Sequence, residues 1–411
     1  MTGNKQEHRY PKSLIPGKRS IAPFLGLLAI LTAGTVLNGG MFLSPYNQLN
    51  VLGRNAIIAL PAVGMTLVIL TGGIDLSVGS FVSLGSVLTA MLLMGRGWNR
   101  ASIFMTAVAA LIGGAALFSV VRNAGRRKSK RRTGSAAGAA VLGAAGLFLL
   151  LSLPVANGFS AAAVLICVPL AGLAMGALSG FFIAKRKIQP FVVTLAMMSA
   201  VLGLSKTVAG SGGRIHPVYY ESADGLSAAA PAAFAWLNSR ISVFGTDIVP
   251  VTALFFLLAV LAVHLLLTRY RFGRYIYAIG GNEEAARLSG VAVGRIKITV
   301  YAFSGWISAL AGVLYCSAYA QGKPDAGATW ELDAIAAVVI GGTSLSGGKG
   351  SVRGTLVGVL ILGYLGNILN LQEVPGEVQD ILKGVIILAA VLLQQGGLLR
   401  FLRNRRREKG E

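Results

Sequence analysis

An aspartate, Asp75, lies between two apolar runs of this chain, in the segment Leu-Thr-Gly-Gly-Ile-Asp-Leu-Ser-Val-Gly-Ser at residues 70–80. An acid at membrane depth is costly and is by default a candidate functional group. Gly72 and Gly73 would interrupt a helix and bring the backbone close to a passing solute, while Ser77 adds a hydroxyl. The alternative is that Asp75 caps the next helix with help from Ser77. The segment predicts a polar point on a solute path, a helix cap, or both.

A second glycine-rich segment echoes this pattern of Gly-Gly, two residues, Leu-Ser and Gly. It runs from Asp333 to residue 351, and its other candidate path residues are Gly341, Gly342, Ser344, Gly347 and Gly348. The echo suggests an internal repeat in which interrupted helices meet at a transport site, with chance similarity as the alternative. The residues around Lys349 are not a phosphate loop, because Thr343 stands where Gly-x-x-x-x-Gly-Lys-Ser/Thr requires glycine. We expect no ATP hydrolysis by this chain alone.

The loop at residues 280–291 has the features of a short capped helix. Asn282 is a good N-cap, and Glu283 and Glu284 follow where the positive end of the helix dipole favours acids. Gly290 would end the helix. The residues between them supply a small apolar face and two polar groups: Ala285, Ala286, Leu288, Arg287 and Ser289. So short a helix is unstable alone, so the loop either docks into a groove on a partner or is a solvated turn.

Catalytic and metal-binding arrangements are missing from the sequence. The histidines His8, His216 and His264 are scattered without ligand spacing, and neither a Gly-x-Ser-x-Gly elbow nor a His-Glu-x-x-His motif occurs. Cys167 and Cys316 lie in apolar runs and are expected to be packed thiols. The sequence predicts that this chain is not an enzyme, holds no metal and binds no cofactor itself.

The elements that must hold these groups are membrane-spanning helices. Of the 411 residues, 54% are hydrophobic and 13% are charged, against about 25% charged in a soluble domain. Apolar runs of about 20 residues match a bilayer core of roughly 30 Å. The composition excludes a soluble enzyme, a disordered chain and a disulfide scaffold, and predicts an all-α polytopic bundle. The twelve predicted spans are 20–42, 51–72, 76–94, 101–121, 136–156, 160–184, 189–209, 241–267, 298–320, 333–347, 352–371 and 379–396.

Basic residues predict the orientation. Of the 37 Lys and Arg residues, 29 fall in segments that are cytoplasmic when the N-terminus is inside, and six fall outside. The tails 1–19 and 397–411 are therefore predicted to be cytoplasmic, on either side of a membrane domain at 20–396. The net charge of +22 gathers at the ends of apolar runs, so it predicts orientation and not nucleic-acid binding. We expect the basic run at 126–132 to contact anionic lipid headgroups.

The same residues resemble the signature of ribose-type ABC transporter permeases. The similar segments are 62–69 (Ala-Val-Gly-Met-Thr-Leu-Val-Ile), 71–79, 189–195 (Gln-Pro-Phe-Val-Val-Thr-Leu), 272–290 (beginning Phe-Gly-Arg-Tyr-Ile-Tyr-Ala-Ile-Gly-Gly-Asn) and 331–351. The similarity covers most of residues 50–95 and 160–395. Several motifs in one order are specific, whereas a single glycine-rich piece would be weak.

The resemblance implies the permease subunit of an ATP-driven importer for a monosaccharide of the ribose, galactoside or xylose class, working by alternating access in the bacterial inner membrane. Its partners would be a second permease copy, ATP-binding subunits that hold ATP and Mg, and an extracytoplasmic sugar-binding protein. The cytoplasmic loop 268–297 would couple to the ATPase through Asn282, Glu283, Glu284, Ala285, Ala286, Arg287, Ser289 and Gly290. The implied sugar path would run along Gly72, Gly73, Asp75, Ser77, Thr194, Glu331, Asp333, Gly341, Gly342, Ser344, Gly347 and Gly348.

One region departs from the family pattern. Residues 97–159 add two apparent spans around the basic loop, where family members pass directly from the third span to the one that ends here at Ala184. An even number of added spans preserves the orientation of everything downstream. Two alternatives stay open: an ion-coupled carrier of a small polar solute, and an ABC permease for a nucleoside or a quorum-signal sugar. A membrane scaffold or lipid-handling enzyme is a weaker alternative, because the chain offers no nucleophile–base pair.

Overall fold

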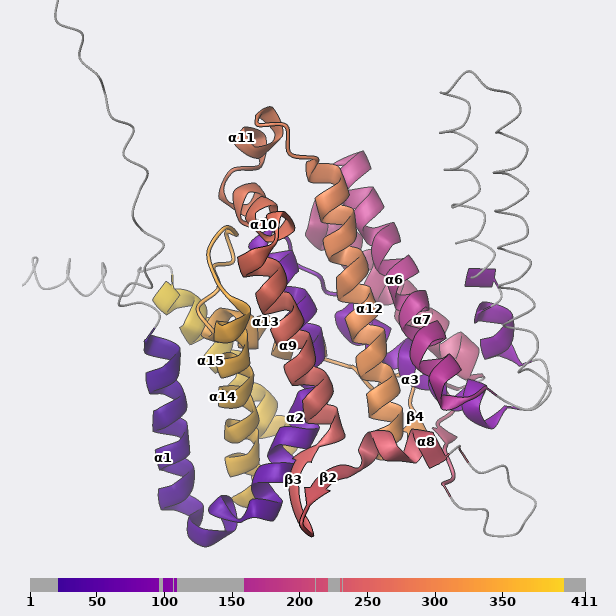
Figure 1. Ribbon diagram of the computed structural model, residues 1–411, viewed down its shortest axis with the longest axis vertical. Coiled ribbons are helices and arrows are strands. Elements are labelled where there is room, and N and C mark those ends of the chain that lie inside the picture. The colour runs from indigo at the N-terminus through magenta and orange to yellow at the C-terminus, as the bar shows by residue number, and fades with distance from the viewer. Residues whose placement is uncertain are drawn as a thin grey trace, which may run out of the picture.

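The computed structural model describes residues 21–95, 99–105, 107–108, 159–210, 212–220, 230 and 232–394. Within these ranges the chain is a bundle whose long helices run side by side (Figure 1). The predicted tails 1–19 and 397–411, and nearly all of the predicted helical pair at 97–159, lie outside the described residues. These domain assignments remain predictions.

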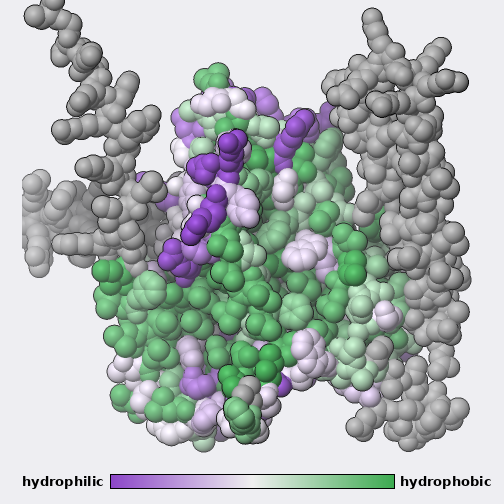
Figure 2. Space-filling view, in the orientation of Figure 1, coloured by the Kyte–Doolittle hydropathy of each residue, from purple (hydrophilic) through white to green (hydrophobic). Residues whose placement is uncertain are grey.

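Among the described residues, seven helices are long and apolar enough to cross a bilayer. They are α1 (Ala22–Leu43), α2 (Pro45–Leu70), α6 (Ala161–Arg186), α7 (Pro190–Ala209), α9 (Val251–Arg269), α12 (Val293–Tyr319) and α14 (Val352–Leu371). The other helices are α3 (Val78–Met94), α8 (Ala232–Ala235), α10 (Arg271–Gly281), α11 (Glu283–Leu288), α13 (Trp330–Ile340) and α15 (Gly376–Gln394). On the face shown in Figure 2, hydrophobic residues cover much of the middle of the molecule, and hydrophilic residues gather toward the end that carries α10 and α11. The protein is therefore a polytopic helical membrane protein, as its composition predicts.

The number of long apolar helices is smaller than the twelve predicted spans. The predicted tenth span is α13, whose 11 residues rise only about 16 Å, too short for a bilayer core. The last predicted span is α15, which carries Glu377, Asp380 and Lys383 near its start. The predicted span 136–156 lies wholly outside the described residues, and of the predicted span 101–121 only residues 101–105 and 107–108 are described, as helix. The total number of crossings and the cytoplasmic position of the termini remain predictions.

Short strands correct the all-α expectation. The predicted span 241–267 begins as a hairpin of β2 (Arg240–Val243) and β3 (Thr246–Pro250), and only then becomes α9. Phe244 and Gly245 have φ angles of 52° and 79°, the left-handed pair that closes a two-residue hairpin turn. A second two-stranded pairing joins β1 (His216–Pro217) to β4 (Gln321–Gly322). Hydropathy alone missed the hairpin because its apolar residues Ile241, Val243, Phe244, Ile248 and Val249 lie directly before the apolar run of α9.

α12 is the central helix of the described bundle and packs against α2, α3 and α6. Its contact with α6 depends on glycine, since a Cβ at Gly172 or Gly176 would overlap the α12 backbone at Gly305 or Tyr301. Lipid offers no hydrophobic drive for helices to associate, so close backbone packing through small residues supplies the attraction. α12 is therefore closely packed on several sides and runs from the α11 end of the molecule to the opposite end (Figure 1).

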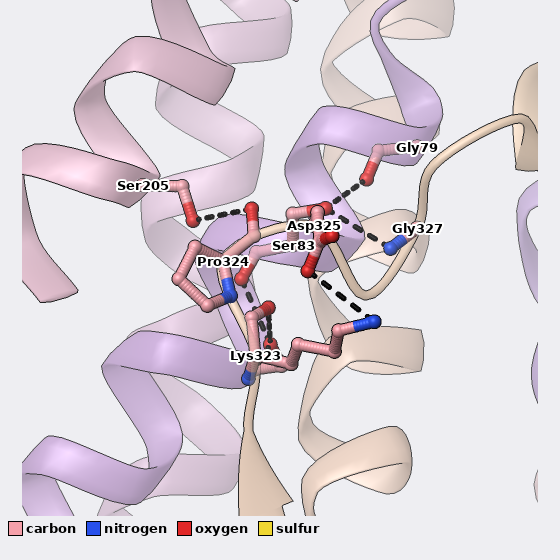
Figure 3. A network of polar contacts seen from close by, with 8 residues as sticks. Gly79, Ser83, Ser205, Lys323, Pro324, Asp325 and Gly327 are labelled. Carbon is pink, nitrogen blue, oxygen red and sulfur yellow. Dashed lines mark hydrogen bonds and ion pairs between the residues drawn. The ribbon is translucent and has the colours of Figure 1, made fainter. Parts of the chain in front are cut away.

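The chain between α12 and α13 runs beside α3 without helical hydrogen bonds. Backbone groups at membrane depth need partners inside the protein. The Ser86 hydroxyl accepts from the N–H of Lys323 at 3.2 Å and donates to its carbonyl at 2.8 Å. The Ser83 hydroxyl accepts from the Gly327 N–H at 3.0 Å (Figure 3). Serines of α3 therefore replace the hydrogen bonds that a continuous helix would supply.

α7 holds the same segment from another direction. The Ser205 hydroxyl donates to the Pro324 carbonyl at 3.2 Å (Figure 3). α13 then begins at Trp330 and ends at Ile340, before the second glycine-rich loop. The predicted short, glycine-rich tenth span is thus a half-helix preceded by non-helical chain. It begins three residues earlier and ends seven residues earlier than the predicted bounds of 333–347.

Candidate solute path and coupling segment

Asp75 is fully buried and joins the first glycine-rich loop to α12. One carboxylate oxygen accepts from the Ser77 N–H at 3.0 Å and from the Ser77 hydroxyl, and the other accepts from the Ser304 hydroxyl of α12 at 2.8 Å. The N-cap residue of α3 is Ser77, and its side chain makes no capping bond. Asp75 lies two residues before that N-cap, and its carboxylate accepts the Ser77 N–H in the manner of a cap, with the Ser77 hydroxyl as a second donor. The same carboxylate also binds the loop to α12 through Ser304.

The two glycine-rich segments end their helices in the same way. Gly72 after α2 and Gly342 after α13 have φ angles of 78° and 88°, which glycine adopts without steric cost. In each case the next N–H, from Gly73 or Thr343, returns to a carbonyl five residues earlier. This is the Schellman arrangement of a helix C-terminus. The structural repeat is offset by one residue from the sequence echo, because Gly72 corresponds to Gly342 and not to Gly341.

The two loops also contact each other, with α10 packed against both. The Gly348 N–H donates to the Leu70 carbonyl at the end of α2, at 3.0 Å. A Cβ at Gly280 of α10 would overlap both of these groups, so three backbones meet there. The predicted meeting of the two interrupted helices is present in the structure. The segment that contacts them both leads directly into α11.

The remaining predicted path residues divide between two places. Thr194 of α7 is buried, and its hydroxyl lies 3.3 Å from the Ile74 carbonyl, beside the Asp75 loop. Asp333 lies away from that loop and pairs with Lys383 of α15 at 3.4 Å. Glu331 is at the first turn of α13, beside Gly79 of α3. Gly341, Ser344 and Gly347 belong to the second loop. The structure therefore does not gather the predicted residues into one site.

The predicted coupling helix is present as α11. The Asn282 side chain accepts from the Ala285 N–H at 2.9 Å, and Gly290 has a φ of 82°, so both predicted caps are confirmed. The predicted apolar face is divided. Ala286 packs inward with Ile279 and Val293, while Ala285 is exposed and Leu288 is 81% exposed. One side of α11 fastens it to this chain, and the other presents an exposed leucine.

Electrostatic contacts hold α11 against α12. Lys297 of α12 is 2.6 Å from Glu283, and Arg287 pairs with Glu283 and Glu284 at 3.1 Å. Burial acts to raise the pKa of Glu283, but hydrogen bonds and charges from Lys297 and Arg287 outweigh it and leave the pKa below the usual 4.5. The Glu283–Lys297 pair is the link between the two helices, because Lys297 is only 15% exposed.

We expect Lys297→Met to loosen α11 while the rest of the bundle stays intact. Because the folded-state pKa of Glu283 is lowered, its stabilisation is present above pH 4.5 and is lost as the pH falls through the lowered value. In the wild type, the protection factors of the α11 amides, which correct for the slower intrinsic exchange at low pH, should therefore fall on acidification, whereas in Lys297→Met they should already be low at pH 7. Arg295→Met is the control, because Arg295 makes no ion pair among the described residues. Equal exchange in the two variants at pH 7 would contradict this role for the pair.

A polar cleft that the sequence analysis missed lies between α2, α13, α14 and α15. Its volume is about 490 Å³, within the roughly 300–1,000 Å³ typical of small-molecule sites. Of the predicted path residues, Asp333 lines it. Its other polar lining residues are Asn47, Asn50, Arg54, Asn55, Tyr319, Asn367, Asn370, Gln379 and Lys383. The signal available in sequence was the series of amides at 47, 50 and 55, spaced to recur on a face of an otherwise apolar helix.

Comparison with known proteins gives a consistent result. Residues 47–127 and 135–391 match the family described as branched-chain amino acid transport system / permease component. The chain is 36% identical to the ribose import permease protein RbsC of Bacillus subtilis (strain 168), over 92% of this chain and 93% of that protein. It is 36% identical to RbsC of Escherichia coli (strain K12), over 93% of this chain and 95% of that protein. It is 35% identical to the xylose transport system permease protein XylH of the same strain, over 89% of this chain and 88% of that protein. No solved structure matches the chain.

Proposed function

Since the chain belongs to the family of branched-chain amino acid transport system permease components, we propose that it is the membrane subunit of an ATP-driven sugar importer. The observation that carries this proposal is the 36% identity to ribose import permeases across more than nine tenths of both chains. The substrate would be a monosaccharide of the ribose, galactoside or xylose class. The chain is a transport subunit and not an enzyme, so ATP and Mg would be bound by a separate ATPase chain.

The proposed assembly contains a second permease copy, ATP-binding subunits and an extracytoplasmic sugar-binding protein. ATP binding would close the ATPase subunits and move α11, and the permease pair would switch between inward-facing and outward-facing states. The exposed side of α11, with Leu288 and Glu284, is the surface we assign to the ATPase. The opposite side, fastened through Glu283 to Lys297, would carry the motion into α12.

The glycine-rich loops are proposed as the inner part of the sugar path. Both loops contact α10, which leads directly to α11. Movement of α11 would therefore shift the loops through α10 alone, with no other helix in between. Asp75 and Ser77 would then position the first loop through the bond to Ser304 on α12. The termini would be cytoplasmic, on the α11 side of the membrane.

The proposal is tested by purifying the tagged chain from its native host in mild detergent and identifying what accompanies it. We expect an ATPase with a phosphate-loop motif, lost in Glu284→Ala and Leu288→Asp and retained in the control Glu377→Ala on α15. Vesicles containing the assembly should take up ribose or xylose when ATP is supplied. Recovery of the chain alone, with uptake that collapses under a protonophore at constant ATP, would instead indicate an ion-coupled carrier.

A further inference from the structure

We infer that the polar cleft between α2, α13, α14 and α15 is where an uncharged polyhydroxylated solute enters this subunit. This inference rests on the proposed function and names a place for its substrate. The cleft is distinct from the Asp75 loop, none of whose residues lines it. Only Asp333 among the path residues predicted from the sequence lines it.

The chemistry of the lining favours hydroxyl groups over ions. Five asparagines and one glutamine line the cleft, and each amide side chain offers both donors and an acceptor. A sugar hydroxyl also donates and accepts, so amides can pair with it in either direction. The charged lining residues are Arg54, Asp333 and Lys383, and the last two already form an ion pair. A bare cation would therefore meet a lining with excess positive charge.

The amides are held in a defined arrangement and are not loose surface groups. Asn47 of α2 and Asn367 of α14 exchange two amide hydrogen bonds of 3.0 and 2.8 Å. Gln379 of α15 donates to Asn370 of α14 at 3.0 Å. These bonds join three of the four helices at the cleft rim. A rigid, pre-organised set of donors and acceptors lowers the entropic cost of binding a small polar ligand.

One end of the cleft lies beside the hairpin, and closely packed residues lie beyond the other end. One turn of α2 past the lining residue Ala62, the Thr66 and Thr355 hydroxyls lie 2.7 Å apart, and a Cβ at Gly358 would overlap the carbonyl of the lining residue Ala337. Near the opposite end, Arg240 of the β2–β3 hairpin donates to Asn50 at 2.9 Å. The hairpin lies at the end of the bundle opposite α10 and α11 (Figure 1). The proposed topology makes that end extracytoplasmic, where a binding protein would release sugar.

Chemical blocking of the cleft tests this inference in the complete transporter. Asn55, which lines the cleft, is replaced by cysteine. The parent carries Cys167→Ala to remove the partly exposed native thiol, and Cys316 is kept because it is buried. A membrane-impermeant, negatively charged methanethiosulfonate is added outside, because the cleft lining carries excess positive charge. We expect labelling of N55C to reduce ATP-driven ribose uptake about tenfold or more, because the attached group occupies the solute's space. Excess ribose with the binding protein should slow that labelling.

The matched control is Gln372→Cys. Gln372 is an exposed amide that follows α14, close in sequence to the lining residues Asn367 and Asn370, but it does not line the cleft. Its labelling should leave uptake unchanged. If Asn55→Cys is inactive before labelling, Asn370→Cys provides the same test from the opposite wall. The inference is overturned if the cleft cysteine is not labelled from outside, or is labelled without loss of uptake. An unlabelled parent assembly that carries no ribose, xylose or galactoside with ATP would overturn the proposed function instead.

Discussion

Gly280→Ala is expected to abolish transport and to destabilise the protein by about 1–3 kcal/mol, the usual cost of overpacking. The added Cβ would overlap the Leu70 carbonyl and the Gly348 N–H, which are bonded to each other. Both atoms belong to backbone, so no side chain can rotate away. The junction of the two glycine-rich loops with α10 would have to open. Sugar uptake and thermal unfolding of the detergent-solubilised assembly measure the two effects.

The neighbouring glycine supplies the control for this substitution. A Cβ at Gly281 would have no heavy atom within 4 Å, and its φ is not positive. Gly281→Ala should therefore retain both transport and thermal stability, despite the identical chemical change one residue away. If the two alanine variants behave alike, contact at Gly280 is not what couples the loops to α10.

Asp75→Ala is expected to destabilise the bundle by roughly 2–4 kcal/mol, because it leaves buried donors without an acceptor. The carboxylate accepts from the Ser77 N–H, from its hydroxyl and from the Ser304 hydroxyl, and all these groups are inaccessible to solvent. Ser304→Ala removes only one donor and should cost about 1 kcal/mol. Transport should fall with Asp75→Ala, since the first loop is no longer held to α12.

A double-mutant cycle separates this bond from other effects. Combining Asp75→Ala with Ser304→Ala should cost less than the sum of the single substitutions, by about 0.5–3 kcal/mol. Ser308→Ala is the control, because the Ser308 hydroxyl donates to the Ser304 carbonyl within the same helix at 2.7 Å. It should combine additively with Asp75→Ala. Additivity for Ser304→Ala as well would show that the Asp75–Ser304 bond contributes nothing.

The helix α11 could be predicted from sequence because its determinants are local. Asn282 and Gly290 lie eight residues apart, and each contributes a short-range bond or a backbone angle that the residue type favours. The same holds for the membrane helices, whose apolar runs are visible in any window of suitable length. The inward packing of Ala286 could not be predicted, since it depends on Ile279 and Val293 in neighbouring helices.

The polar cleft could not be assembled from sequence because its walls come from distant parts of the chain. Asn47 and Asn367 are 320 residues apart and still exchange side-chain hydrogen bonds. Nothing in the segment around either asparagine indicates the other. The hairpin before α9 was missed for a different reason. Its apolar residues resemble a helix start, and only the turn at Phe244 and Gly245 distinguishes it.

The serine contacts of the segment before α13 have a consequence for the order of synthesis. The backbone groups of residues 323–327 find partners in Ser83 and Ser86 of α3 and in Ser205 of α7. Both helices precede this segment in the chain, so a ribosome produces the partners before the groups that need them. Residues 323–327 can thus fold against a surface that already exists. In a circular permutant with new termini between α3 and α7, these residues would be synthesised before α3, so their backbone groups would lack the Ser83 and Ser86 partners until α3 was made.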